Sequence, residues 1–392
     1  MIAQTLRAVK RRLLTSSVVQ VSSQKTLLAM TLRSGLPHAD ATGTMRALGH
    51  FGFEREVRKP MFALCPEDLG LILTYRCHSG CKHCLYNCGP RWEKEPISSS
   101  ALRQALEAVC TWPRRPQVHL TGGEPFLCFE RLLEGAQIAT ELGLACYVET
   151  SASWCVDEVE AVARFTRLRE AGLQAVLISC SPFHAERIPP IRTMRAIHAA
   201  LKVFGPQQTI VYLPNFIEVV QRFDVGRPTP LARYEEEFGP ERAGQILWGG
   251  YGIISGGRAG YRLGHLVPRY PVTTLAHERC ARELLYAPHS HFDLYGNFIA
   301  SFCGGLTVGD WHDLPQLLDD FQAGRYPPLV ERLIEHGPYG LFEWAQARYG
   351  YQPLPDGYTG KCHLCVDVRR HLVQVAAEDF PELRPRGFYT HL

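Results

Sequence analysis

The chain of 392 residues lacks any long apolar segment. No run approaches the ~18 apolar residues of a membrane-spanning helix, and no unbroken apolar stretch of the signal-peptide type follows the N-terminal basic residues. Short internal repeats and strong compositional bias are also missing. These absences argue against a membrane span, a fibrous protein and a disordered chain. We expect a cytoplasmic protein of two or three domains with a well-filled core.

Cysteine, by contrast, is abundant, with fourteen residues. A chain of this length does not need disulfides to build a core, and disulfides are rare in a reducing compartment. Clustered cysteines in such a setting are more often metal ligands or redox groups. The spacing of the cysteines therefore decides what they do.

Positive charge is concentrated in the first sixty residues. Ten Lys and Arg residues oppose three acidic ones there, a net charge of +7 that leaves −4 for the remainder of the chain. Ile2, Leu6, Val9 and Leu13 recur at helical spacing among basic residues. We expect residues 1–62 to form a basic helical extension, either packed on the main domain or in contact with a membrane surface.

From about residue 66, strand-like and helix-like segments alternate. The strand-like runs cover residues 71–75, 118–120, 145–148, 175–179 and 209–213. The helical runs cover residues 98–111, 129–142, 156–170 and 193–203. This alternation predicts βαβ units and a parallel sheet, closed or partly closed as a barrel. Chemistry in such folds gathers at the carboxyl ends of the strands.

The first cysteine group follows the first predicted strand. Cys77, Cys81 and Cys84 stand within eight residues, so three thiolates can surround one metal centre from a single loop. A closed zinc site needs a fourth ligand, for which Cys88, His78 or His83 is available. The spacing favours an iron–sulfur centre but leaves zinc open.

The sequence HLTGGEP, residues 119–125, stands at the end of the next predicted strand. Gly122 and Gly123 allow close backbone approach to a ligand, and Glu124 before Pro125 supplies a fixed carboxylate for an ammonium group. Alone, this motif is explained equally well by a tight turn before a helix. Together with the cysteine loop it is far more specific.

The combination of CX3CX2C and GGEP on a βα scaffold resembles the radical S-adenosylmethionine (SAM) superfamily, over about residues 66–260. The resemblance implies that Cys77, Cys81 and Cys84 hold a [4Fe–4S] cluster whose open iron chelates SAM. It implies that Gly122, Gly123, Glu124 and Pro125 contact the methionyl amino group. Reductive cleavage of SAM would give a 5′-deoxyadenosyl radical that takes a hydrogen atom from the substrate.

Later strand ends match the family less tightly. The resemblance implies SAM-binding roles near the ribose, carboxylate and adenine for a further group of residues, with a plain loop role as the alternative: Thr150, Ser151, Ser153, Ser179, Arg258 and His83. Ser181 stands where the family usually has Asp. We leave Cys88 unligated, because a fourth ligand would block SAM.

A second cysteine group, Cys280, Cys303, Cys362 and Cys365, has gaps of 22, 58 and 2 residues. Four thiolates suit either zinc or a fully ligated four-iron cluster, and spacing alone slightly favours zinc. Downstream of a radical SAM core, however, the arrangement resembles the twitch or SPASM type of domain. That resemblance implies an auxiliary [4Fe–4S] cluster without an open iron, which serves as an electron relay.

Two further residues are expected at the mouth of the barrel. His184 and Glu186 follow a strand, and we predict a catalytic role for them as general base or substrate anchor, against a structural role in a loop network.

The resulting hypothesis is an α/β protein with a partial (β/α)6 TIM-like barrel over residues 63–265. A small α+β auxiliary-cluster domain follows over residues 266–392. We expect a radical SAM oxidoreductase that acts on a small polar metabolite such as a sugar, aminocyclitol or nucleoside.

The alternatives are a maturase of a ribosomally made peptide and, more remotely, a non-enzymatic zinc protein. The expected partners are the small-molecule or peptide substrate and an external one-electron reductant of the flavodoxin or ferredoxin type. No nucleic acid is expected.

Overall fold

The computed structural model describes residues 63–392, and Ala63–Leu392 form one compact unit. The predicted basic helical extension over residues 1–62, and its predicted contact with a membrane surface, lie outside the described residues. Within the described part, no helix is long and apolar enough to cross a membrane.

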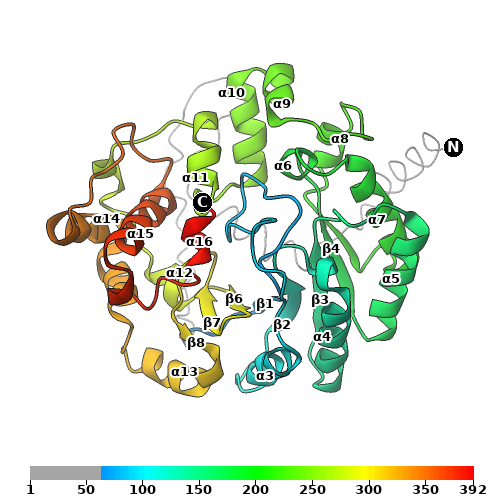
Figure 1. The fold of residues 1–392 in the computed structure, drawn as a ribbon, viewed down its shortest axis with the longest axis horizontal. Coiled ribbons are helices and arrows are strands. Elements are labelled where there is room, and N and C mark those ends of the chain that lie inside the picture. The colour runs from blue at the N-terminus through cyan, green and yellow to red at the C-terminus, as the bar shows by residue number, and fades with distance from the viewer. Residues whose placement is uncertain (1–62) are drawn as a thin grey trace, which may run out of the picture. The chain divides into compact units, whose positions relative to one another are not determined.

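An eight-stranded sheet in the order β5-β4-β3-β2-β1-β6-β7-β8 forms the centre of this unit (Figure 1). Strands β1 to β6 run parallel to one another, and β7 pairs antiparallel with both β6 and β8. The strands are β1 Asp68–Ile72, β2 Gln117–Thr121, β3 Cys146–Thr150, β4 Ala175–Ser179, β5 Thr209–Tyr212, β6 His289–Asp293, β7 Asn297–Ala300 and β8 Gly309–Asp310.

Helices that connect the parallel strands cover one face of the sheet. They are α3 Ser99–Val109, α4 Phe129–Glu141, α5 Glu158–Glu170 and α7 Pro190–Phe204. Ser98 caps α3 and Asp157 caps α5 through side-chain oxygens, as helix starts require. Leu120 of β2 points at this layer, since a Cβ on Gly135 of α4 would lie 3.1 Å from its side chain. Side chains at alternate positions of β2 therefore face the opposite side of the sheet.

One short helix, α6 Pro182–Ala185, lies between β4 and α7. Further short helices follow β5 and lead to the C-terminal part, namely α8 Phe216–Val220, α9 Leu231–Phe238, α10 Pro240–Ala243, the π-helix Gly244–Gly249, α11 Ala259–Arg262 and α12 Ala281–Leu285. Phe183, Leu247 and Trp248 belong to one buried apolar cluster here. This cluster fixes the segment that returns to the cysteine loop.

The sixth parallel strand comes from the C-terminal part of the chain. β6 pairs with β1 in register Gly70↔His291, and the tight turn at Gly296 then leads into β7. Four more helices complete the unit, namely α13 Leu314–Gln322, α14 Pro328–Tyr349, α15 Lys361–Ala376 and α16 Gly387–Thr390. The α/β class with a mainly parallel sheet and C-terminal helices and antiparallel strands is confirmed. The boundary at 265/266 stays a prediction, although the sheet continues across it.

The first strand lies earlier than the sequence pattern predicts. Residues 71–75 read as the strand, whereas β1 spans Asp68–Ile72 and pairs on both sides over that range. Thr74 and Arg76 instead accept backbone hydrogen bonds from Gly123 and Glu124, at 2.7 and 2.9 Å. The apolar run therefore continues past the sheet into the wall of the site.

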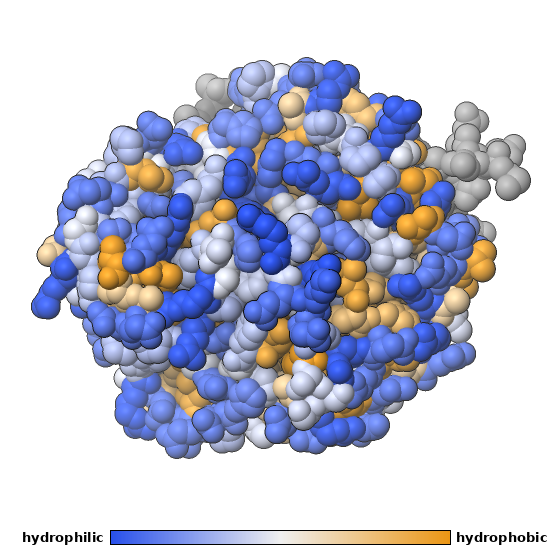
Figure 2. Space-filling model, in the orientation of Figure 1, coloured by the Kyte–Doolittle hydropathy of each residue, from blue (hydrophilic) through white to orange (hydrophobic). Residues whose placement is uncertain are grey.

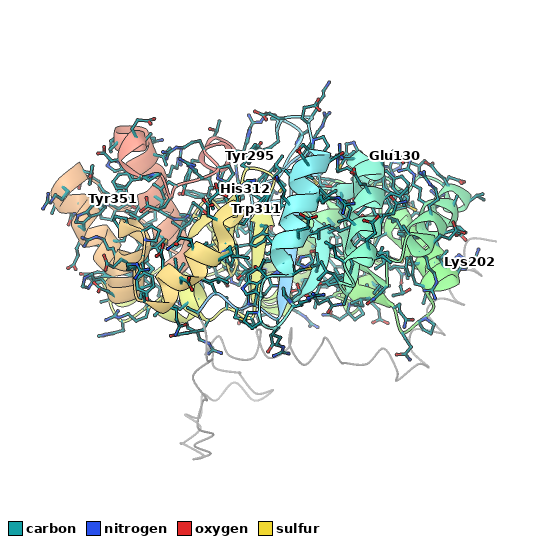
Figure 3. All side chains as sticks on the ribbon, turned by 90° about the horizontal axis from the view of Figure 1, so that it is seen from below. Glu130, Lys202, Tyr295, Trp311, His312 and Tyr351 are labelled. Carbon is teal, nitrogen blue, oxygen red and sulfur yellow. The ribbon has the colours of Figure 1, made fainter. Side chains whose placement is uncertain are left out.

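The surface is ordinary for a globular unit. Figure 2 shows a mostly hydrophilic face on which apolar residues are scattered in small groups. Trp311 and His312, labelled in Figure 3, stack at 3.8 Å, and the indole of Trp311 donates to the carbonyl of Asp293 at the hairpin turn. Tyr351 lies among the C-terminal helices, far from that pair in the same view.

Candidate functional site

The first cysteine loop follows β1 at its carboxyl end. Cys77 and Cys81 are buried, and Cys84 is half-buried. Burial raises the pKa of Cys77 and Cys81, and the negative charge of Cys84 raises both pKa values further, so the three sulfurs lie within electrostatic reach of one another. The structure therefore brings together the three thiols that the sequence singled out. Cys88 lies beside them, because its thiol donates a hydrogen bond to the sulfur of Cys84 and lowers the pKa of Cys84.

Arg258 holds this loop in place. Its guanidinium is buried and donates to the carbonyls of Cys81 and Cys88, at 3.0 and 2.6 Å. Its charge also lowers the pKa of Cys81 and Cys84. Gly257, with φ +53°, lies against the same loop, since a Cβ there would be 2.3 Å from the carbonyl oxygen of Cys84. Gly257 and Arg258 thus position the cysteine loop.

The two glycines of the GGEP motif approach the chain's own backbone. A Cβ on Gly122 would lie 2.3 Å from the carbonyl oxygen of Thr74, and one on Gly123 would lie 2.1 Å from that of Arg76. Any side chain at either position would push the motif away from the end of β1. The glycines fix the distance between the cysteine loop and Glu124.

Glu124 is fully buried and its carboxylate is held by several donors. Thr150 donates to Oε1 at 2.8 Å, while the backbone N–H and the hydroxyl of Ser151 donate to Oε2 at 3.0 and 2.5 Å. Burial raises the pKa of Glu124, and these hydrogen bonds oppose that rise. The structure joins the predicted residues at 124, 150 and 151 into one polar cluster, and Glu124 is also the N-cap of the short 3-10 helix Pro125–Cys128.

Two other predicted SAM-binding residues have different neighbours. The hydroxyl of Ser153 lies 3.4 Å from Nδ1 of His78 in the cysteine loop. The hydroxyl of Ser179 donates to Glu149 at 3.4 Å. Both stay predictions as SAM ligands, and both lie at carboxyl ends of parallel strands, β3 and β4.

His83 and His184 form an aromatic group beside the cysteine loop. Nε2 of His83 lies 3.0 Å from the hydroxyl of Tyr251, and its ring lies 4.8 Å from that of Phe183 and 4.9 Å from that of His184. Nδ1 of His184 lies 2.7 Å from the hydroxyl of Ser181. Burial lowers the pKa of His184 to about 4 and lowers that of His83 as well, so both rings are neutral near pH 7.

Glu186 has a partner of its own. Lys82 Nζ lies 2.6 Å from Oε1 of Glu186, which ties the helix after β4 to the cysteine loop. The structure thus gives His184 and Glu186 separate partners rather than joining them as an acid–base pair. A catalytic role for either stays a prediction.

Polar atoms without partners mark the loop as a place for a further group. Within residues 63–392, the hydroxyl of Ser79 and Nδ1 of His83 are buried and have no hydrogen-bond partner. Buried polar atoms are nearly always paired, and exceptions often mark a bound group. Three soft thiolate donors beside them match an iron–sulfur centre, and the residues present fit that cofactor.

The second cysteine group is assembled from distant segments. Cys280 precedes α12, Cys303 follows β7, and Cys362 and Cys365 lie on the first turn of α15. Burial raises the pKa of Cys280, and the charges of the other three cysteines raise it further, so the four sulfurs face one another. Folding gathers them as the sequence predicts.

Basic side chains border this second group. Lys361 bonds to Glu283 at 2.8 Å, and its charge lowers the pKa of Cys280 and Cys362. Arg369 is buried, donates to the carbonyls of Cys365 and Gly304, and lowers the pKa of Cys303. Two fixed positive charges offset the burial of four thiolates.

The spacing of the sulfurs bears on the choice between zinc and iron. Four thiolates on one zinc lie about 3.8 Å apart, given Zn–S bonds of about 2.3 Å in a tetrahedron. Within residues 63–392, a single group of three His, Cys, Asp or Glu side chains has its ligand atoms within 4.8 Å of one another, and it contains no cysteine. As they stand, no three sulfurs of either cysteine group within residues 63–392 lie that close together.

The two cysteine groups are neighbours. A Cβ on Gly304 would lie 2.3 Å from the carbonyl oxygen of Leu85, so the residue after Cys303 touches the residue after Cys84. The charges of Cys303 and Cys84 both raise the pKa of Tyr86. Leu85 and Tyr86 thus separate the two groups.

Sequence reasoning missed several polar residues inside the sheet's open face. Glu149 of β3 accepts hydrogen bonds from Thr121 and Ser179, at 3.5 and 3.4 Å. Its charge also raises the pKa of Tyr212 and Tyr251. The signal was present in the alternation of β3, where Glu149 is two residues from Tyr147 on the same face.

The fold and site together define an α/β protein with two neighbouring, largely buried cysteine groups, the first of which follows β1 at its carboxyl end. No family model matches the chain, and no curated protein matches it either. Its structure is similar to that of BtrN in complex with AdoMet and 2-DOIA, at 12% identity and a TM-score of 0.41 over 70% of this chain and 89% of that chain.

It is also similar to anSMEcpe with bound AdoMet and the Cp18Cys peptide, at 12% identity and a TM-score of 0.38 over 80% of this chain and 98% of that one. The histidine-tagged form of anSMEcpe with bound AdoMet gives 12% identity and a TM-score of 0.40 over the same shares. These values describe a likeness of fold and carry no information on substrate or activity.

Proposed function

We propose that the protein is a radical SAM oxidoreductase that carries one SAM-binding [4Fe–4S] cluster and one auxiliary [4Fe–4S] cluster. The observation that carries this proposal is the meeting of the three-cysteine loop with the buried Glu124 cluster at the ends of adjacent strands. The loop offers three thiolates and leaves a fourth position open, and the polar cluster stands where a charged ligand of that position would be held.

Different residues would hold the cluster, position its loop and bind SAM. Cys77, Cys81 and Cys84 would hold the SAM-binding cluster, which when bound to SAM supplies a 5′-deoxyadenosyl radical for hydrogen abstraction. Arg258 keeps the loop in shape through the carbonyls of Cys81 and Cys88. The Glu124 carboxylate, fixed by Thr150 and Ser151, favours a positively charged amino group. Neutral His83 offers its ring face to a planar base.

The second cysteine group supports an oxidative outcome. Its four thiolates leave no coordination position for substrate, so electron transfer is the role that remains. Leu85 and Tyr86 connect it to the first loop by direct contact. An electron left on the substrate after hydrogen abstraction would then pass to this group. A flavodoxin or ferredoxin would supply the electron that starts the reaction.

The polar interior of the sheet supports a small polar substrate, such as a sugar, aminocyclitol or nucleoside. Glu149, Tyr212 and Tyr251 lie on the open face between the cysteine loop and the sheet. Glu149 provides an anionic anchor for hydroxyl or ammonium groups.

The test is anaerobic reconstitution with iron and sulfide, followed by dithionite, SAM and a panel of deuterated polyols, aminocyclitols, nucleosides and peptides. We expect about eight irons per chain, 5′-deoxyadenosine as a product, and deuterium transfer from one class of small molecule. Transfer from a peptide instead would move the assignment to a peptide maturase. Absence of 5′-deoxyadenosine with both clusters in place would overturn the proposal.

A further inference from the structure

Three histidines meet on the open face of the sheet, below the cysteine loop. His119 belongs to β2, and His289 and His291 belong to β6, the strand on the other side of β1. One ligand nitrogen of each ring lies within 4.8 Å of the other two. His119 and His291 are buried, and His289 is half-buried. Neither cysteine centre uses these residues.

The register of the sheet brings them together. Gly70 of β1 pairs with His119 on one side and with His291 on the other. A Cβ at Gly70 would lie 2.7 Å from Nε2 of His119 and 2.7 Å from Nε2 of His291. Cδ2 of His291 would lie nearer still, at 2.3 Å, so the absence of a side chain at position 70 lets both rings lie against the backbone of β1. Any other residue at position 70 would displace both rings.

The opposite nitrogen of each ring has an oxygen acceptor. Nδ1 of His119 lies 2.7 Å from Oδ1 of Asp68, and Nδ1 of His289 lies 3.1 Å from the same oxygen. Nδ1 of His291 lies 3.3 Å from the carbonyl oxygen of Ser301. With the proton on each Nδ1, these oxygens can accept it and the three Nε2 atoms carry no proton, as histidine ligands of a metal require. The hydroxyl of Tyr86 also lies 3.3 Å from Nε2 of His291, so a metal there would compete with that contact.

Asp68 is itself held in place. Its second oxygen accepts a hydrogen bond from Tyr147 at 2.9 Å. A half-buried carboxylate beside two imidazoles raises their basicity as ligands. It also supplies negative charge against that of a cation.

The distances suit a transition metal. Nε2 of His289 and Nε2 of His291 lie 3.2 Å apart. Two nitrogens on one tetrahedral ion, with bonds of about 2.0–2.1 Å, lie about 3.3 Å apart. Neutral imidazoles select Zn²⁺, Fe²⁺, Co²⁺ or Ni²⁺ over Mg²⁺ and Ca²⁺, which prefer oxygen.

We propose that His119, His289 and His291 form a mononuclear transition-metal site, separate from both cysteine centres and oriented by Asp68. Three protein ligands leave a coordination position for water or for an oxygen of a bound molecule. Tyr86, whose hydroxyl lies 2.9 Å from Nδ1 of His291, connects this site to the cysteine loop. The proposal does not depend on SAM chemistry and stands or falls by itself.

The alternative is a metal-free proton network. In that arrangement the Nε2–H of His291 donates to Nε2 of His289, and Tyr86 donates to Nδ1 of His291. The same distances allow it, so metal binding must be measured directly.

The experiment uses the full chain, reconstituted anaerobically so that the cluster cysteines are occupied, then desalted and titrated with Co²⁺ alone under equilibrium dialysis. We expect one Co²⁺ per chain with a visible spectrum of nitrogen ligation, and displacement by Zn²⁺. The variants His119→Ala and His291→Ala should weaken binding at least about a hundredfold, and Asp68→Asn about ten- to a hundredfold.

Gly70→Ala is the sharpest variant, because one methyl group would displace two ligand rings while no ligand is lost. It should abolish Co²⁺ binding. The matched control is His336→Ala, an exposed histidine on α14 that contacts Glu335, and it should bind as the wild type does. Iron content and far-UV circular dichroism report whether each variant folds.

Two outcomes overturn the proposal. One is a wild-type protein with full iron content that binds no Co²⁺, which leaves the proton network as the explanation. The other is Co²⁺ binding that the changes at His119, His291 and Gly70 leave intact. The first outcome depends on the wild-type protein alone, so the proposal can be overturned even if a variant fails to fold.

Discussion

The two cysteine groups differ in how the chain builds them. The first comes from one loop of eight residues, Cys77 to Cys84, whereas the second needs residues between Cys280 and Cys365 that only tertiary structure joins. The first has three thiols on the SAM-type spacing and a polar pocket beside it, and the second has four. A locally built centre can leave a position open for chemistry, while a closed centre is suited to electron transfer.

Their surroundings differ as well. Beside the first group stand neutral histidines, His83 and His184, together with the buried cation Arg258 and with Lys82, which is paired with Glu186. Beside the second stand two cations, Lys361 and Arg369. Positive charge near a cluster favours its reduced form, so Arg369 and Lys361, the latter paired with Glu283, would favour reduction of a cluster held by the second group.

The largest expected effect separates the roles of the two groups. Cys81→Ala should lower the rate of 5′-deoxyadenosine formation by about a thousandfold or more, because no SAM-binding cluster forms. Cys303→Ala should leave uncoupled SAM cleavage within about threefold while iron falls from about eight to about four per chain. Product chromatography and iron analysis measure both. Loss of SAM cleavage in the Cys303 variant, with the first cluster spectroscopically intact, would contradict the division of roles.

A smaller effect is expected at the polar cluster. Glu124→Gln keeps the shape and removes the charge, so SAM binding should weaken about ten- to a hundredfold, which is about 1.4–2.8 kcal/mol. Equilibrium dialysis of the reconstituted protein measures it. Glu130→Gln is the control, since that side chain lies on the outer surface of α4 and is labelled in Figure 3. Equal binding by the two variants would remove Glu124 from the site.

The two buried arginines offer a matched pair. Arg258→Lys loses the double contact to Cys81 and Cys88 carbonyls, and Arg369→Lys loses that to Cys365 and Gly304. Lysine cannot reproduce a forked contact.

We expect each change to speed loss of iron from its own cluster by about tenfold and to leave the other unaffected. Chelator-driven bleaching followed by electron paramagnetic resonance distinguishes the two clusters. Parallel loss from both clusters in both variants would show that the centres are not independent.

The smallest effect concerns pH. Burial lowers the pKa of His184 to about 4, whereas an unfolded histidine titrates near 6.5. Below pH 6.5 the unfolded chain gains a proton that the folded chain does not take up until about pH 4. Stability is therefore present above pH 6.5 and falls as the pH drops through this window, by about 1.4 kcal/mol per unit at most.

His184→Gln removes this penalty. Between pH 7.5 and 5.5, the free energy of unfolding of the wild type should fall by about 1.4 kcal/mol more than that of the variant, as measured by denaturant titration at each pH. His336→Gln, at an exposed position, should follow the wild type. Identical pH profiles for all three proteins would mean that the pKa of His184 is the same in the folded and the unfolded state.

The sequence was informative where chemistry is local. The positions of Cys77, Cys81 and Cys84 predict a shared centre because eight residues cannot separate them widely. The strand at 175–179 is predicted with its observed bounds, and α4 starts at Phe129 as expected. The joining of Glu124 to Thr150 and Ser151 also follows, since adjacent parallel strands end at the same edge.

What the sequence did not reveal depends on β6. Residues 266–392 were expected to form a separate domain, so nothing indicated that His289 and His291 would lie beside β1. Pairing between strands about 220 residues apart cannot be inferred from periodicity. The polar residues of β2 and β6 alternate with apolar ones in the sequence. Only the pairing of both strands with β1, however, shows that these polar side chains meet.

Gly304 against Leu85 has a consequence for how the protein acquires its metals. The first cysteine loop leaves the ribosome long before Cys362 and Cys365 exist, and at that time the segments that later cover it are absent. Cluster insertion there can precede folding of the C-terminal helices. The second group cannot bind a cluster before the C-terminal helices are synthesised, because its last two ligands, Cys362 and Cys365, lie on α15. Metallation of this chain should therefore proceed in a fixed order, from the exposed early loop to the late enclosed one.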